Sequence, residues 1–176
     1  MSKILFLLFV FSISLYSQGN FLINFYNRDF TVTKQEIISL FVKEPGVKIT
    51  KDSANYFVIR GVKWVEFETK KIEIIFVDDT IGNFVMVIKD TLNLMKNYNT
   101  ILNMMEMQFG HSHEAAKKND EYFVHNRRWV KHLVYKEDSI LQLAITKPNC
   151  GQLFIAYMNV GRLNRLFDRN RTEILK

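Results

Sequence analysis

The stretch Asp90–Gly110 constrains the fold more than any other, because it is long and its apolar residues have helical spacing. Five apolar side chains recur at intervals of three and four residues: Met95, Tyr98, Leu102, Met105 and Phe109. This spacing places all five on one face of an α-helix. Three more residues widen that face: Leu94, Ile101 and Met104. A helix with one broad apolar face must cover an apolar surface elsewhere in the chain.

Both ends of this helix carry the expected signals. Asp90 or Thr91 can accept hydrogen bonds from amides of the first turn, and Gly110 can adopt the left-handed conformation after the last turn. The segments on either side are dense in aromatic and β-branched residues, which favour strands. We therefore predict an α+β domain organised around the helix.

Strands are predicted in two blocks. The first block precedes the helix and comprises Tyr56–Ile59, Val62–Phe67, Ile72–Val77 and Phe84–Ile88. The second follows it and comprises Tyr122–His125, Trp129–Tyr135, Ile140–Thr146 and Leu153–Met158. A shorter helix is predicted from Thr33, which has capping-box spacing to Glu36, and Pro45-Gly46 should end it. Phe21–Tyr26 is interpreted as a first strand or an arm covering the core.

The two blocks resemble one another in order and residue class. Trp64-Val65 corresponds to Trp129-Val130, and Gly82–Ile88 corresponds to Gly151–Tyr157. The pattern predicts a tandem helix-plus-antiparallel-strands repeat, with half-repeats at about 30–89 and 90–159. Two small sheets could then join, with the two helices packed on one face of a sheet.

The N-terminus has the order of a secretory signal peptide. Lys3 supplies a positive charge, Ile4–Tyr16 is apolar apart from two serines, and the small residue Ser17 follows. The apolar run is shorter than the roughly 20 residues of a membrane span. We predict a signal peptide at 1–17, a single domain at 18–176, and export to the periplasm or the medium. The alternative is an uncleaved membrane anchor.

The tail, residues 160–176, is predicted to be a basic helix. Leu163, Leu166 and Phe167 share one side, and arginines surround them at Arg162, Arg165, Arg169 and Arg171. These arginines are either solvated or a contact for a partner or anionic surface. The formal net charge of +6 is modest and spread along the chain. With export, nucleic acid is not an expected partner, whereas envelope lipid or polysaccharide is compatible with this charge.

A histidine cluster offers the strongest candidate for chemistry. His111 and His113 would project from the same side of an extended segment, and Glu114 follows at once. Together they could bind Zn²⁺ or Cu²⁺, with His125 or His132 completing the site. The competing interpretation is that His111, just past a helix C-terminus, interacts with the helix dipole without a metal.

Other candidates have simpler structural explanations. Cys150 is the only cysteine, so no intrachain disulfide can form, and no motif around it indicates a thiol enzyme. Asp78-Asp79 lacks the further oxygen ligands of a calcium loop and is predicted to be a hairpin turn. Trp64 and Trp129 could form a sugar platform, but their matching positions favour twin core anchors.

These observations predict a small exported, non-enzymatic binding protein without a cofactor. Its partner is expected to be a protein or a cell-envelope component. The alternative is a metal-binding protein or metal-dependent enzyme that uses His111, His113 and Glu114. A third hypothesis is a structural subunit whose arm, Phe21–Tyr26, pairs with a neighbour's sheet edge.

Overall fold

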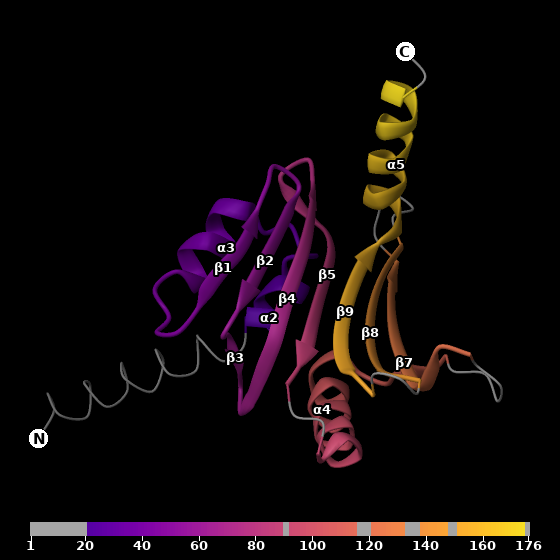
Figure 1. Cartoon of the computed structure of the whole chain (residues 1–176). Helices are drawn as coiled ribbons and strands as arrows, with labels where there is room; N and C mark the ends of the chain where they lie inside the picture. The colour runs from indigo at the N-terminus through magenta and orange to yellow at the C-terminus, as the bar shows by residue number, and fades with distance from the viewer. Residues whose placement is uncertain (1–20, 90–91, 116–120, 133–137, 148–150, 175–176) are drawn as a thin grey trace, which may run out of the picture.

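The computed structural model describes residues 21–89, 92–115, 121–132, 138–147 and 151–174 (Figure 1). This part of the chain is a mixed α+β fold dominated by an antiparallel sheet of nine strands. Its helices are α2 (Phe21–Asn27), α3 (Lys34–Phe41), α4 (Leu94–Phe109) and α5 (Val160–Ile174). Its first five strands are β1 (Lys48–Asp52), β2 (Tyr56–Arg60), β3 (Lys63–Trp64), β4 (Phe67–Val77) and β5 (Thr80–Ile88). The others are β6 (His113–Glu114), β7 (Phe123–His132), β8 (Asp138–Thr146) and β9 (Leu153–Asn159).

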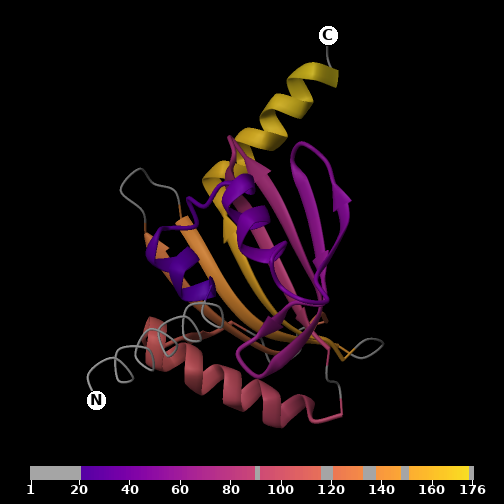
Figure 2. The ribbon, with the colours of Figure 1, turned by 90° about the vertical axis from the view of Figure 1, so that its left-hand side faces the viewer.

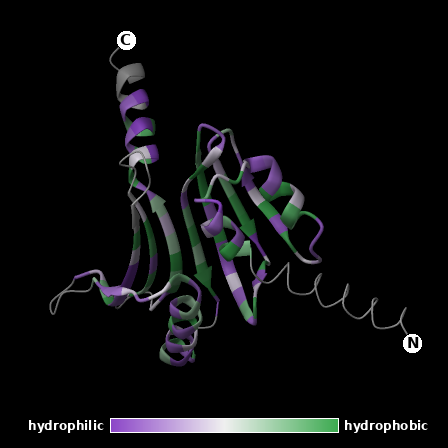
Figure 3. Ribbon diagram, turned by 180° about the vertical axis from the view of Figure 1, so that it is seen from behind, coloured by the Kyte–Doolittle hydropathy of each residue, from purple (hydrophilic) through white to green (hydrophobic). Residues whose placement is uncertain are grey.

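Two meanders form the sheet, and a single strand pair joins them. The strand order is β1-β2-β4-β5-β9-β8-β7-β6, with β3 paired to β4 outside this path. β5 and β9 pair antiparallel at the centre, where Met86 lies opposite Ile155. In Figure 3 the hydrophobic colour follows the central strands, as expected for strands with neighbours on both sides.

One face of the sheet carries the core. The register aligns six large side chains across it: Phe57, Ile74, Phe84, Tyr157, Leu141 and Trp129. The rings of Phe21 and Phe25 in α2 lie 6.3 and 6.2 Å from the ring of Phe84. On the same face, Phe109 of α4 lies 6.4 Å from Trp129. Figure 2 shows α2 and α3 in front of the sheet and α4 beneath it.

The prediction that Phe21–Tyr26 is a strand is wrong, because these residues belong to α2, whereas the alternative that the segment covers the core agrees with its burial. Phe21, Leu22 and Phe25 are buried. Their spacing of one and four residues fits one face of a helix, which the dense apolar run concealed. The segment is therefore part of the core and is not free to pair with another chain.

Both helices that were predicted before the tail are present. The Thr33–Glu36 capping box begins α3, which ends at Phe41, four residues before Pro45. Gly110 follows α4 with a φ of 82°, whereas the proposed caps Asp90 and Thr91 lie outside the described residues. In α4 the buried residues are Tyr98, Ile101 and Met105, so Ile101 lies at the centre of the apolar face and Met95 is exposed.

The strand predictions differ from the structure in particular places. β1 was not predicted, because all five of its residues are exposed and no apolar alternation marks it. The two predicted strands at Tyr122–His125 and Trp129–Tyr135 are continuous in β7 as far as His132. Asp78 and Asp79 form a tight hairpin turn, as predicted, with φ angles of 51° and 58°.

The remaining predictions concern two buried tryptophans and several segments that lie outside the described residues. Trp64 and Trp129 are both buried, as expected of core anchors. The predicted signal peptide at 1–17, Cys150 and the last two residues of the tail lie outside the described residues. Among the helices that are described, none is long and apolar enough to cross a membrane.

α5 is fixed to the sheet by its first turns and then extends beyond the end of β9 (Figure 1). Arg162 is buried, and its Nη1 donates to the carbonyl oxygens of Ile81 at 2.8 Å and Phe30 at 3.2 Å. Phe30 in turn stacks on Tyr157, with 3.5 Å between ring centroids. A single guanidinium thus connects α5, β5 and the loop after α2.

Replacement of Arg162 by Met should destabilise the fold by about 1–3 kcal/mol, because the carbonyl oxygen of Ile81 loses this donor and that of Phe30 keeps only the amide of Ile81 at 3.3 Å. The measurement is urea unfolding followed by circular dichroism. Arg165→Met is the matched control, since the Arg165 side chain is 47% exposed and its nearest ion-pair contact to Asp78 is 3.9 Å. Equal shifts of the unfolding midpoint for both variants would contradict this role for Arg162.

Candidate binding surfaces

The face of the sheet opposite the core, called the open face below, presents two adjacent rows of side chains. The Tyr56 row crosses six strands and contains Tyr56, Ile75, Asn83, Met158, Ile140 and Val130. The Glu73 row crosses eight strands and contains Lys51, Val58, Glu73, Val85, Ala156, Gln142, Arg128 and His113. Neighbouring residues on a strand point to opposite faces, so these rows face away from Phe84 and Tyr157.

Apolar side chains lie along the open face from β4 to β7, with Asn83 between Ile75 and Met158. Ile75, Val85 and Ile140 are half-buried, while Met158 and Val130 are 39% and 45% exposed. Large apolar side chains left accessible on adjacent strands are typical of an interaction surface rather than of a solvated one. At one end of the sheet Leu163 of α5 lies close to Gly82 of β5, so α5 packs against that end.

Polar groups flank this apolar centre on both sides. On β2 and β4, Tyr56 donates to Glu73 at 2.8 Å, and Lys71 lies 2.9 Å from the same carboxylate. The hydrogen bond to Glu73 is the main cause that raises the pKa of Tyr56. Across the sheet, Gln142 donates to Asn126 at 2.9 Å, and Arg128 lies beside it in the Glu73 row.

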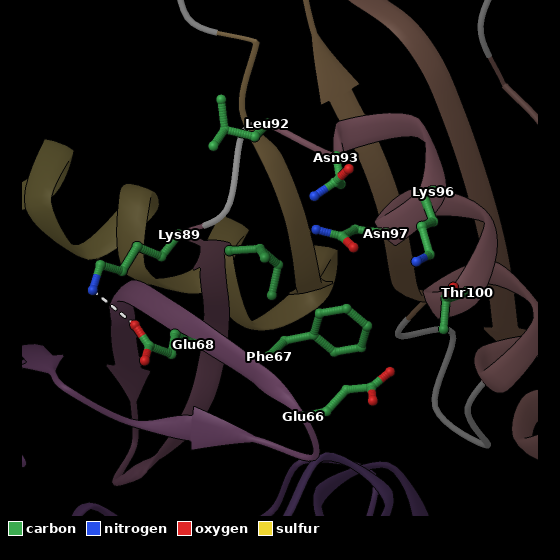
Figure 4. A pocket seen from close by; sticks show the side chains of 10 residues that line it. Glu66, Phe67, Glu68, Lys89, Leu92, Asn93, Lys96, Asn97 and Thr100 are labelled. Atoms are coloured by element: carbon green, nitrogen blue, oxygen red, sulfur yellow. Dashed lines mark hydrogen bonds and ion pairs between the residues drawn. The ribbon is translucent and has the colours of Figure 1, made fainter.

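A separate pair of hollows lies at one end of the sheet. The larger, of about 650 Å³, lies between the β3–β4 turn and the first turns of α4 (Figure 4). Its neighbour, of about 510 Å³, is lined by the turn after β2 and the adjoining part of β4. Both are lined by Glu68 and Lys89, whose side chains form an ion pair at 2.7 Å.

No family model, curated protein or solved structure matches this chain. The function must therefore be inferred from these surfaces.

The structure separates Glu114 from the histidine beside it. His113 lies opposite Arg128 in the Glu73 row, whereas the carboxylate of Glu114 forms an ion pair with Arg127 at 2.8 Å. His125 lies on the core face, 5.1 Å from the ring of Tyr98. Within the described residues, no group of three or more His, Cys, Asp or Glu side chains could hold a metal ion. Metal binding by His111 and His113 remains a prediction.

The segment around His111 is instead organised by hydrogen bonds. The hydroxyl and amide of Ser112 donate to the carboxylate of Glu106 at 2.7 and 3.4 Å, which lowers the pKa of Glu106. Nε1 of Trp129 donates to the carbonyl oxygen of Gly110 at 2.7 Å. Burial is the main cause that raises the pKa of Tyr98. These contacts connect the end of α4 to β7.

The three tail arginines proposed as a partner contact have partners within the chain. Arg162 is buried as described above. Arg169 donates to both carboxylate oxygens of Asp78 at 2.7 and 3.3 Å, and Arg165 lies 3.9 Å from the same carboxylate. Phe167, by contrast, is 65% exposed. Contact between these arginines and an anionic surface remains a prediction.

Apart from His113, sequence reasoning did not identify the residues of the two rows or of the hollows as a binding site. Leu141, Leu143 and Ile145 indicated the buried side of β8, so the exposed side of that strand could have been inferred. The order of strands across the sheet could not, because it depends on the β5–β9 pairing.

The Asp78 contact should make stability depend on pH. Arg169 donates to this carboxylate and thereby lowers its pKa below the ordinary value of 3.8. A carboxyl group whose pKa is lowered by folding stabilises the protein above its unfolded pKa, and this stabilisation is lost as pH falls through the folded pKa.

Asp78→Asn should therefore lower the melting temperature at about pH 6, and the difference from the unchanged protein should vanish near about pH 2. Asn tolerates the positive φ at this position, so the turn should be preserved. The measurement is thermal unfolding across the pH range, with Asp79→Asn as control. A difference that is constant with pH would contradict the ion pair.

Proposed function

We propose that this protein is an exported, non-enzymatic binding protein that takes a protein partner on the open face of its sheet. The observation that carries the proposal is the run of accessible apolar side chains at Met158, Ile140 and Val130, with polar and charged side chains beside it. This combination of an apolar centre and a polar rim is the usual anatomy of a protein interface. Export is proposed on the signal-like order of Lys3, Ile4–Tyr16 and Ser17.

The dimensions of the open face suit a protein better than a small molecule. The Tyr56 row crosses six strands, and strands lie about 4.8 Å apart, so the row is about 24 Å long. A standard interface buries about 800 Å² on each partner, equivalent to a square roughly 28 Å across. The open face therefore matches the scale of one ordinary protein–protein contact.

The sheet face supports this function better than the sheet edges do. β1, at one edge, carries exposed Lys48 and Lys51 and has an irregular register between Ile49 and Lys51. β6, at the other, has two residues. Lysines, irregularities and short strands are devices that prevent pairing with another chain. Because Phe21–Tyr26 is helical and buried, it cannot serve as the strand-pairing arm of a structural subunit.

We also propose that the scaffold is a tandem repeat in which α3 and α4 occupy equivalent positions. Each is followed by an antiparallel meander, and the two meanders meet at β5 and β9. The correspondence of Gly82–Ile88 with Gly151–Tyr157 makes Met86 equivalent to Ile155, and these two residues are register partners. A two-fold axis through this pair would relate the halves, and would make the open face one surface to which both contribute.

The charge of the open face indicates the character of the partner. Lys51 and Arg128 lie toward opposite ends of the Glu73 row, and Glu73 between them is engaged by Lys71 and Tyr56. Complementarity then favours a partner with an apolar contact surface and acidic groups at its rim. Acidic substitutions among the apolar side chains of the open face should therefore weaken the binding of such a partner.

The test is affinity capture from cross-linked cell envelopes and culture medium, read by mass spectrometry. The unchanged protein should recover one stoichiometric partner, and Val130→Glu/Met158→Glu should recover at least tenfold less. Both changed residues lie in the Tyr56 row, and burying a carboxylate in an interface without a partner is costly.

The matched control is Val42→Glu/Met107→Glu, which makes the same residue changes at exposed positions on α4 and just after α3. It should recover the partner fully, and both variants should unfold at the temperature of the unchanged protein. Recovery of the bait alone, or equal recovery with both variants, would reject binding on the open face.

Export has its own test. Intact mass spectrometry of the protein from the periplasm or the medium should give a chain that begins at Gln18, since Ser17 is the expected last residue of the signal. A small residue at this position is needed for cleavage, so Ser17→Phe should leave the longer chain associated with the membrane. An uncleaved protein found in the cytoplasm would contradict the proposal.

A further inference from the structure

The two hollows at the end of the sheet form one polar groove, separate from the open face. We call it the lysine groove and define it by the linings of the two hollows. Each hollow has the volume of a typical ligand site, about 300–1,000 Å³. Their shared residues, Glu68 and Lys89, make them neighbours along a single path.

The lysine groove concentrates positive charge. Its cations come from β2, β3, β4, the end of β5 and α4: Arg60, Lys63, Lys70, Lys89 and Lys96. Two carboxylates line it, and that of Glu68 is engaged by Lys89 at 2.7 Å. Among the described lining residues, this leaves one carboxylate, that of Glu66, and four cations, so the net charge of the groove is positive. Like charges are collected here at a cost in repulsion, and a hollow concentrates their field on whatever enters it.

The four remaining cations are available to a ligand. Arg60, Lys63, Lys70 and Lys96 are all exposed, and within the described part of the chain none forms a close ion pair. Lys63 lies opposite Glu68 in the strand register, and its charge contributes to the lowered pKa of Glu68. Lysine side chains on separate strands and on a helix provide point charges spread along the groove. This distribution suits a ligand with several anionic groups along its length better than a single anion.

The uncharged lining favours a carbohydrate. Asn93, just before α4, and Asn97 and Thr100 of α4 line the larger hollow on the side opposite Phe67 (Figure 4). Amides and hydroxyls both donate and accept hydrogen bonds, as sugar hydroxyls require. Phe67 is only 7% exposed, so these polar groups supply the accessible uncharged lining. An acidic peptide would instead need an unpaired strand edge or apolar pockets for its side chains.

The backbone at the far end of the lysine groove is held rigidly. Gly61 has a φ of 79°, and a Cβ at this position would collide with the carbonyl oxygen of Gly46. The turn between β2 and β3 therefore packs directly on the loop before β1. This contact fixes the positions of Arg60 and Lys63 on either side of the turn.

We propose that the lysine groove binds an acidic polysaccharide, a chain of sugars that carry carboxylates. Successive sugars lie in the two hollows, the carboxylates contact the lysines and Arg60, and the hydroxyls exchange hydrogen bonds with the side chains of α4. The groove and the open face are separate surfaces, so this binding is independent of the protein partner.

The probe is a hexasaccharide of galacturonic acid, titrated into the purified full chain by isothermal calorimetry at low and moderate salt. Binding should weaken as salt rises, because exposed charges are screened. The neutral hexasaccharide of glucose should bind at least tenfold more weakly, since it lacks carboxylates. A hexaglutamate peptide, which has equal charge and no sugar hydroxyls, should also bind at least tenfold more weakly.

Lys63→Gln/Lys96→Gln removes one charge from each hollow and should reduce affinity for the charged hexasaccharide at least tenfold. The matched control is Lys43→Gln/Lys51→Gln, which removes the same charge at exposed positions outside the groove and should leave affinity unchanged. No binding of the charged hexasaccharide, equal losses in both variants, or equal affinity for hexaglutamate would each overturn the proposal.

Discussion

The pairing of β5 with β9 is the constraint on which the rest of this structure depends. Neither meander has a helix or strand that closes its inner edge, and each inner edge is satisfied by the other. At this junction Phe84 lies opposite Tyr157, and Phe30 stacks on Tyr157 at 3.5 Å. The aromatic residues of α2 meet the same Phe84 ring. Loss of this pairing would expose backbone donors and acceptors along both strands, as well as the centre of the core.

A few polar contacts hold segments that are distant in the chain close to the β5–β9 junction. Arg162 donates to the carbonyl oxygens of Ile81 and Phe30, and the latter also accepts from the amide of Ile81 at 3.3 Å, so these hydrogen bonds join three segments in the interior. Asp78 engages two arginines one helical turn apart on α5. Arginines that look like a basic tail in the sequence therefore hold the tail to the body. Their charge is partly used inside the molecule, which leaves the lysine groove as the more accessible region of positive charge.

The two proposed binding surfaces differ in chemistry because they are built differently. The open face consists of side chains from paired strands, whose alternation sends apolar residues such as Met158 and Val130 outward in one continuous row. The lysine groove consists of strand ends, turns and the start of α4, where no regular alternation applies. The first surface is broad and apolar at its centre, and the second is hollow and cationic. Each suits a different partner, so one scaffold can hold both at once.

Particular elements show what the sequence alone determined. The period of Asp90–Gly110 specified α4, the Thr33–Glu36 spacing specified the start of α3, and two adjacent aspartates specified the turn before β5, because each signal is local. Phe21–Tyr26 was misjudged, since a short apolar run fits a buried helix and a strand equally well. β1 gave no signal because its residues are solvated. Only the tertiary structure decided that Glu114 faces Arg127 while His113 lies beside Arg128, and that four lysines and Arg60 from separate segments line one groove. These arrangements follow from strand order and register, which arise from contacts between residues far apart in the chain.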